Sequence, residues 1–89
     1  MYYVYVLKSL KYKSLKIYIG FTNNLEVRLL QHNQKNTLST RYGIPWKLVY
    51  YEAFLSKRDA IIREKRLKTG SSAIGFLKLR IKKSLVDYN

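Results

Sequence analysis

The chain has 89 residues, of which 18 are Lys or Arg and five are Asp or Glu, so its formal net charge is +13. A hydrophobic fraction of 47% suffices for one compact core and argues against disorder, and we expect a single domain over residues 1–89 with its core over about 1–83. Cysteine is absent and histidine occurs once, which excludes a disulfide framework, a thiolate nucleophile and a multi-histidine metal site. Without an apolar run of 18 residues, we expect a soluble, cytoplasmic protein with no membrane partner.

The positive charge indicates a polyanionic partner. Nucleic acid is the first interpretation, ahead of a ribosomal or anionic membrane surface and of a basic surface that serves solubility alone. Ten of the eighteen basic residues lie between residues 57 and 83, with only two carboxylates among them. We expect these ten to form a nucleic-acid-binding face: Lys57, Arg58, Arg63, Lys65, Arg66, Lys68, Lys78, Arg80, Lys82 and Lys83.

Three segments have the β-branched and aromatic composition of strands: residues 2–8, 15–21 and 46–54. The link at residues 9–14 is polar, rich in lysine and short, so the first two strands are predicted to pair antiparallel.

A first helix is predicted from Leu25 to Gln34, because Asn23 and Asn24 can cap its start and Glu26 lies near the positive end of its dipole. A second is predicted from Lys57 to Thr69, with Ser56 as its cap and Gly70 at its end.

A last helix is predicted to start with Ser71 or Ser72 as its cap and to run to about Ser84. One stripe of this helix is apolar and consists of Leu77, Ile81 and Leu85. The order β-β-α-β-α-α predicts an α+β domain in which helices pack on a small sheet.

Four of the five carboxylates have ordinary explanations. Asp59 and Glu26 suit helix starts, Glu52 lies near the end of a strand where it can face solvent, and Asp87 is in the C-terminal tail.

Glu64 differs because its neighbours at helical spacing are mainly apolar: Ala60, Ile61, Leu67 and Lys68. A carboxylate close to a buried face must be paired or bind a metal. Two readings therefore stay open: an ion pair with Arg or Lys, or a ligand for a hard divalent cation such as Mg²⁺, which commonly takes one or two protein carboxylates.

Arg28 and His32 are four residues apart and therefore share one face of the first helix. An arginine can hold phosphate oxygens bidentately, and a histidine can move a proton near neutral pH. The alternative is two solvated polar residues without a common role.

The chain has nine tyrosines, and most can be strand packing. Tyr18 stands out because Gly20 follows it in a predicted strand, where a glycine often marks the close approach of another group. A phenol serves as a base only where cations depress its pKa, and this chain is rich in cations.

These features resemble the GIY-YIG endonuclease superfamily. Its two name-giving motifs correspond to Tyr3-Val4-Tyr5 in the first strand and Tyr18-Ile19-Gly20 in the second. Residues 18–33, 46–52 and 60–65 look like its further sequence blocks, and the similarity extends to about Lys83. The chain is most similar to small single-domain members related to the N-terminal nuclease domain of excinuclease ABC.

The resemblance implies a three-stranded antiparallel sheet flanked by helices, and cleavage of a phosphodiester with one divalent metal, Mg²⁺ or Mn²⁺. Carried over residue by residue, it implies that the catalytic residues are Tyr5, Tyr18, Arg28, His32 and Glu64, with Glu64 as the metal ligand.

Two departures matter. Tyr3 and Val4 stand where the first motif has glycine and isoleucine, and after Glu64 the only asparagine is Asn89, although some relatives use a downstream asparagine. The additional DNA-recognition domain that most well-studied relatives carry is not expected in 89 residues, so target choice stays open.

The function expected from this resemblance is a metal-dependent endonuclease that cuts nucleic acid, DNA first, in repair or recombination, and leaves a 5′-phosphate and a 3′-hydroxyl. Tyr5, Tyr18 and His32 all stay candidates for the general base. The alternatives are a non-catalytic nucleic-acid-binding module on the same fold and a basic ribonucleoprotein scaffold. We expect a monomer or a weak dimer.

Overall fold

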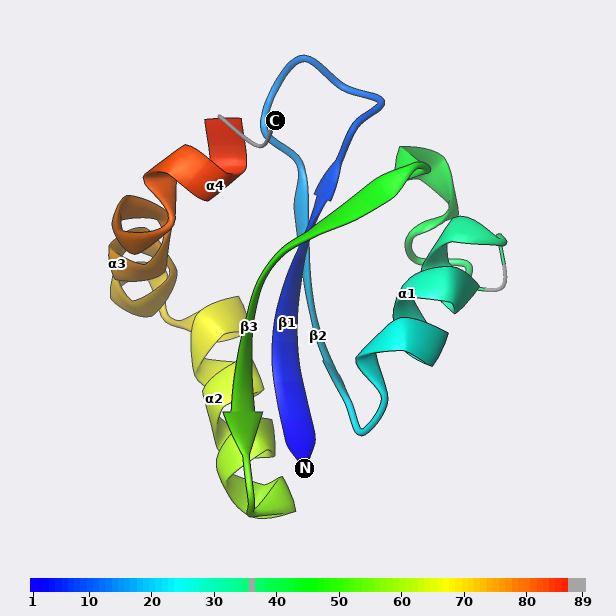
Figure 1. Ribbon diagram of the computed structural model, residues 1–89. Helices are drawn as coiled ribbons and strands as arrows, with labels where there is room; N and C mark the ends of the chain where they lie inside the picture. Colours follow the sequence, from blue (N-terminus) through cyan, green and yellow to red (C-terminus); the bar gives the residue numbers. More distant parts are fainter. Residues whose placement is uncertain (36, 87–89) are drawn as a thin grey trace.

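The computed structural model describes residues 1–35 and 37–86 and has an open antiparallel sheet between two layers of helices (Figure 1). The sheet consists of β1 (Tyr2–Ser9), β2 (Ile17–Thr22) and β3 (Trp46–Phe54), in the order β2-β1-β3. The predicted three-stranded α+β architecture is confirmed. Asp87 and Asn89, about which the sequence raised expectations, lie outside the described residues.

The central strand β1 is buried on both of its faces. Val4 and Val6 belong to one apolar cluster, on the side of the C-terminal helices, while Tyr5 and Leu7 belong to another, on the opposite side. All four side chains are at most 2% exposed. A strand covered on both faces needs apolar side chains at successive positions, which explains why this segment does not alternate.

One layer is the helix α1 (Leu25–Asn33), followed by the short 3₁₀ turn η1 (Arg41–Gly43) (Figure 1). The side chain of Asn24 accepts a hydrogen bond from the backbone N–H of Val27, as the predicted cap requires. The helix ends at Asn33, one residue before the predicted end.

The other layer contains α2 (Lys57–Thr69), α3 (Ser71–Arg80) and α4 (Lys82–Val86) (Figure 1). Ser56 caps α2 through the N–H of Asp59, and α2 has the predicted bounds. Among residues 1–35 and 37–86, no helix has the length and apolar character needed to cross a membrane.

The prediction of one last helix to Ser84, capped by Ser71 or Ser72, was wrong. Gly70 is the cap residue, and the helix is divided at Ile81, whose backbone (φ −107°, ψ 25°) leaves the helical region. The predicted apolar stripe nevertheless holds, because Leu77, Ile81 and Leu85 are all buried. Tertiary burial of this stripe therefore extends across the break in the helix.

Candidate active site

Tyr5 and Gly20 face each other across the pairing of β1 with β2, and this pairing positions the candidate site. A Cβ atom on Gly20 would lie only 2.3 Å from both the Cζ and the hydroxyl oxygen of Tyr5. The tyrosine ring thus occupies the space that any other side chain at position 20 would fill. The expected close approach of another group to Gly20 is therefore found, and the group is Tyr5.

The hydroxyl of Tyr5 begins a buried chain of hydrogen bonds. Its oxygen lies 2.7 Å from Nε2 of His32, and Nδ1 of the same ring lies 2.7 Å from Oγ1 of Thr40. All three side chains are at most 2% exposed. The Thr40 hydroxyl donates to the carbonyl of Thr37 at 3.5 Å, which leaves its oxygen free to accept from Nδ1–H. In this tautomer, Nε2 has no proton and accepts the hydroxyl proton of Tyr5.

Burial controls the protonation of this chain. Burial raises the pKa of Tyr5 to about 12, although the Arg28 guanidinium opposes the rise, and Tyr18 and Glu64 add to it. Burial, with the charge of Arg28, lowers the pKa of His32 to about 4. Both groups are therefore neutral at pH 7. The expectation that cations depress the pKa was wrong for Tyr5, and so was the expectation that His32 titrates near neutral pH, because desolvation is the largest effect on each.

Tyr18 lies beside this chain on the edge strand β2. Its ring centroid is 5.0 Å from that of His32 and 6.4 Å from that of Tyr5. The ammonium of Lys68 lies 5.7 Å from the Tyr18 centroid, within the range of a cation–π contact. Two tyrosines, the histidine and a lysine from four different elements thus meet at the β2 edge of the sheet.

Arg28 contributes a partly buried guanidinium from α1. Its Nη1 donates to Oε1 of Gln31 at 3.0 Å, and its charge acts on both Tyr5 and His32. The spacing of four residues indeed places Arg28 and His32 on the same side of the helix. Because only one of its hydrogen bonds is to a neighbour on α1, the fork geometry of the guanidinium suits an oxyanion such as phosphate.

Glu64 lies on α2 with its carboxylate 22% exposed and 3.1 Å from the Nζ of Lys68. Since Lys68 contacts Tyr18, the carboxylate is at the same edge of the sheet. The residues described contain no group of three or more His, Cys, Asp and Glu side chains that could enclose a metal. One accessible carboxylate fits a hard cation such as Mg²⁺, which keeps waters and substrate phosphate as its other ligands.

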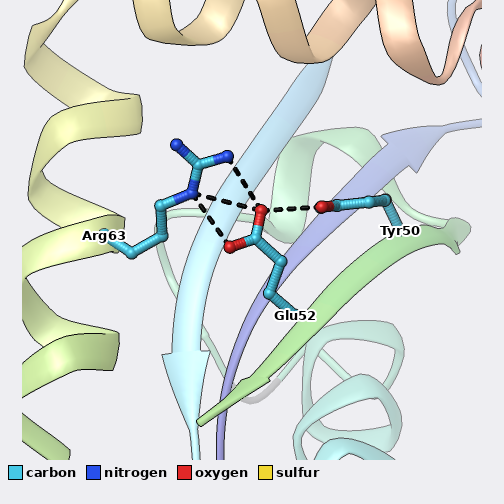
Figure 2. Close-up of polar contacts among 3 residues, drawn as sticks. All are labelled: Tyr50, Glu52 and Arg63. Carbon is cyan, nitrogen blue, oxygen red and sulfur yellow. Dashed lines mark hydrogen bonds and ion pairs between the residues drawn. The ribbon is translucent and has the colours of Figure 1, made fainter.

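A separate cluster joins β3 to α2. Nε of Arg63 donates to both carboxylate oxygens of Glu52, at 2.9 and 3.1 Å, and Nη2 donates to Oε2 at 2.8 Å (Figure 2). The hydroxyl of Tyr50 donates to the same Oε2 at 2.7 Å (Figure 2). The cluster fixes α2 against the sheet at the residue before Glu64.

The cluster corrects one expectation and qualifies another. Glu52 does not face solvent: burial alone would raise its pKa, but hydrogen bonds from Arg63 and Tyr50 lower it below the ordinary value. Arg63, expected in the nucleic-acid-binding face, has its guanidinium engaged by Glu52 and is half-buried. The other nine members of that predicted face are exposed on α2, α3 and α4.

Sequence reasoning missed the residues that support His32 from behind. Thr40 is fully buried, and its carbonyl accepts a 2.7 Å hydrogen bond from the indole N–H of Trp46. Asn33 bonds both the N–H and the carbonyl of Trp46, at 2.6 and 3.0 Å, and so ties α1 to β3. The only sequence signal was polar side chains next to the predicted helix and strand, which is common in loops.

Comparison with known proteins agrees with this geometry. The family model described as GIY-YIG catalytic domain matches residues 1–76. A UPF0213 protein of Clostridium perfringens is 46% identical over 69 residues, which cover 76% of this chain and 71% of the relative. A UPF0213 protein of Staphylococcus haemolyticus is 41% identical over 71 residues, with 79% and 83% covered. No solved structure matches. This chain therefore belongs to the GIY-YIG family.

Proposed function

We propose that this protein is a divalent-metal-dependent endonuclease that hydrolyses phosphodiester bonds in DNA, with residues 1–89 forming one nuclease domain. The observation that carries the proposal is the convergence of Tyr5, Tyr18, His32 and Arg28 with the accessible carboxylate of Glu64 at one edge of the sheet. Membership of the GIY-YIG family supports a nuclease-type activity.

In this proposal Glu64 holds Mg²⁺ or Mn²⁺, and Arg28 binds a non-bridging oxygen of the scissile phosphate. A bound divalent cation would supply neutralisation of the charge that develops on the phosphate and the leaving 3′ oxygen. The guanidinium of Arg28 stabilises the pentacovalent transition state by charge-assisted hydrogen bonds. The exposed Lys68 draws the phosphate backbone towards the same edge.

Tyr5 and His32 move the proton of the attacking water. As the water attacks, its proton passes to the Tyr5 oxygen, and the Tyr5 hydroxyl proton passes to Nε2 of His32, which lies 2.7 Å away. Thr40 keeps the other ring nitrogen protonated and the ring oriented. Of the three candidate bases, this assigns His32 as the final proton acceptor and Tyr5 as the relay. The products are a 5′-phosphate and a 3′-hydroxyl.

The test is a nicking assay on supercoiled plasmid and on branched DNA, with and without Mg²⁺ or Mn²⁺. Tyr5→Phe should lose cleavage by roughly 10²-fold or more, since it removes only the hydroxyl that relays the proton. Tyr51→Phe is the matched control, because Tyr51 pairs with Tyr5 from β3 but is 52% exposed.

Cleavage that persists in EDTA would overturn the metal requirement, and equal activity of both variants would overturn the role of Tyr5. A protein that binds DNA but never cuts it would favour a non-catalytic binding module. Preference for branched over intact duplex DNA would support a place in repair or recombination.

A further inference from the structure

A hollow of about 350 Å³ opens next to the candidate active site, at the end of the sheet where β1 begins, β2 ends and α2 begins (Figure 1). Its volume is within the range of about 300–1,000 Å³ that is typical of ligand sites. Arg28 belongs both to this hollow and to the surroundings of Tyr5, so the two are contiguous. The lining residues are Tyr2, Phe21, Thr22, Asn23, Arg28 and Lys57.

The apolar part of the lining is a pair of parallel aromatic rings. The rings of Tyr2, on β1, and Phe21, on β2, have centroids 6.2 Å apart and planes that differ by only 7°. Both side chains are half-buried against the core, which holds them in place. A rigid aromatic surface of this kind is what a nucleobase stacks on, and such stacking does not depend on which base is present.

The polar part of the lining is cationic. Lys57 and Arg28 bring two positive charges, Thr22 and Asn23 bring neutral hydrogen-bonding groups, and none of the six lining residues carries a carboxylate. Phosphate attraction and base stacking are the two features that single-strand binding sites combine.

A second hollow, of about 470 Å³, lies on the α1 side of the sheet and lacks this combination. Its aromatic residues, Tyr3 and Tyr51, meet edge to face at 69°, and the carboxylate of Glu26 lines it. Because a carboxylate repels phosphate, this hollow is the weaker candidate and provides the matched control.

We propose that the hollow lined by Tyr2, Phe21 and Lys57 is a subsite for one unpaired nucleotide of the substrate strand. The base stacks on the Tyr2–Phe21 ring pair and its phosphate lies against Lys57. The subsite's place beside the scissile phosphate rests on the proposed function, through Arg28.

This subsite determines a class of substrate. A base within an intact duplex is stacked on its neighbours and must be unstacked, at a cost of a few kcal/mol, before it can enter such a site. A strand that is already unpaired, as in a flap, a branch or a single strand, enters without that cost. The protein should therefore prefer DNA with unpaired nucleotides over continuous duplex.

The first test uses the wild-type protein and needs no cleavage. Single-stranded DNA in which several thymines are replaced by 5-iodouracil is bound in EDTA and irradiated, and the cross-linked peptides are mapped by mass spectrometry. Cross-links at Tyr2 or Phe21 support the subsite. Cross-links that instead occur at Tyr3 or Tyr51 overturn it, because they would show that bases lie in the other hollow.

The second test compares affinities in EDTA for a single strand and for a duplex of the same sequence. Phe21→Leu and Tyr2→Leu keep apolar volume in the core but remove the rings, and each should weaken single-strand binding by about 5- to 100-fold while duplex binding changes less than about twofold. Tyr51→Leu should leave both affinities unchanged. An unchanged ratio of single-strand to duplex affinity in a folded Phe21→Leu or Tyr2→Leu protein overturns the subsite.

The outcomes separate this proposal from the proposed function. A protein that cuts DNA but shows neither the cross-link nor the change in affinity ratio loses the subsite and remains a nuclease. A protein that cross-links at the Tyr2–Phe21 pair but never cuts keeps the nucleotide subsite and loses the nuclease assignment.

Discussion

The hydroxyl oxygen of Tyr5 lies 2.7 Å from Nε2 of His32, although the two residues are 27 positions apart in the chain. This contact joins the middle of the central strand to the last turns of α1, and both partners are buried. It makes the protonation of one group depend on the other, because the tyrosine hydroxyl needs an acceptor and the bare imidazole nitrogen needs a donor.

Acid should destabilise the protein through His32 before it protonates the carboxylates. The pKa of His32 is about 4 in the folded protein and 6.5 in the unfolded chain, so the unfolded state binds the proton first as the pH falls. The stabilisation is complete above pH 6.5 and is lost as the pH falls through 4, by about 3 kcal/mol in total. Urea unfolding at a series of pH values measures this slope.

His32→Gln is the control for that slope. It should flatten the dependence of the unfolding free energy on pH between about 6.5 and 4.5, a window above the titration of Glu52, whose pKa is lowered. A variant with the same slope as wild type in this window would contradict the assignment to His32.

Gly20→Ala should disturb the site, whereas Gly75→Ala should not. The new Cβ at position 20 would lie 2.3 Å from the Tyr5 hydroxyl oxygen, so the ring must move away from His32. We expect a loss of about 1–3 kcal/mol in stability and a marked loss of cleavage. Nothing lies within 4 Å of a Cβ at Gly75 on α3, so alanine there should stabilise the helix by about 0.5–1 kcal/mol. Similar effects of both substitutions would refute the close-packing argument.

Glu64→Ala should abolish cleavage while leaving the protein stable. Its partner Lys68 is 45% exposed, and an exposed pair at i,i+4 contributes only about 0.3–0.5 kcal/mol. DNA affinity should be unchanged or higher, because a negative charge is removed. Nicking, a thermal melt and DNA binding are measured together, with Glu26→Gln as an exposed carboxylate control. A folded Glu64→Ala protein that still cuts would exclude Glu64 as the metal ligand.

The Glu52–Arg63 pair should be worth more than the Glu64–Lys68 pair. Three hydrogen bonds join its partly buried side chains, and hydrogen bonds to charged groups are stronger than neutral ones. A double-mutant cycle with Glu52→Gln and Arg63→Leu should give a coupling free energy of about 1–2 kcal/mol. The same cycle at Glu64 and Lys68 should give less than about 0.5 kcal/mol. Equal couplings would show that the cluster does not hold α2 specifically.

Salt should weaken DNA binding steeply, with α2, α3 and α4 responsible. Each phosphate contact adds about 0.9 to the slope of log affinity against log salt for duplex DNA. Replacing Lys78 and Lys82 by glutamine should therefore reduce the slope by about 2, whereas replacing Lys35 and Arg41, exposed near α1, should leave it nearly unchanged. Equal reductions for both pairs would argue for charge attraction without a defined binding face.

Local patterns in the sequence determined the elements of this protein. Asn24 and Ser56 mark helix starts because their side chains satisfy backbone N–H groups only three residues away. The run from Val4 to Leu7 required a strand covered on both faces, and Gly20 announced a close neighbour without naming it. The motif residues Tyr5, Tyr18, Arg28, His32 and Glu64 could also be selected from spacing and resemblance.

Only the tertiary structure decided how deeply those residues are buried and which groups they contact. Spacing places His32 on a face of α1, but the Thr40 loop and Trp46 bury its ring and shift its pKa far from neutrality. Glu52 became the partner of Arg63 because β3 and α2 pack together, which no local pattern records. Desolvation and pairing depend on segments that are distant in sequence, so protonation at this site follows from packing and not from residue type alone.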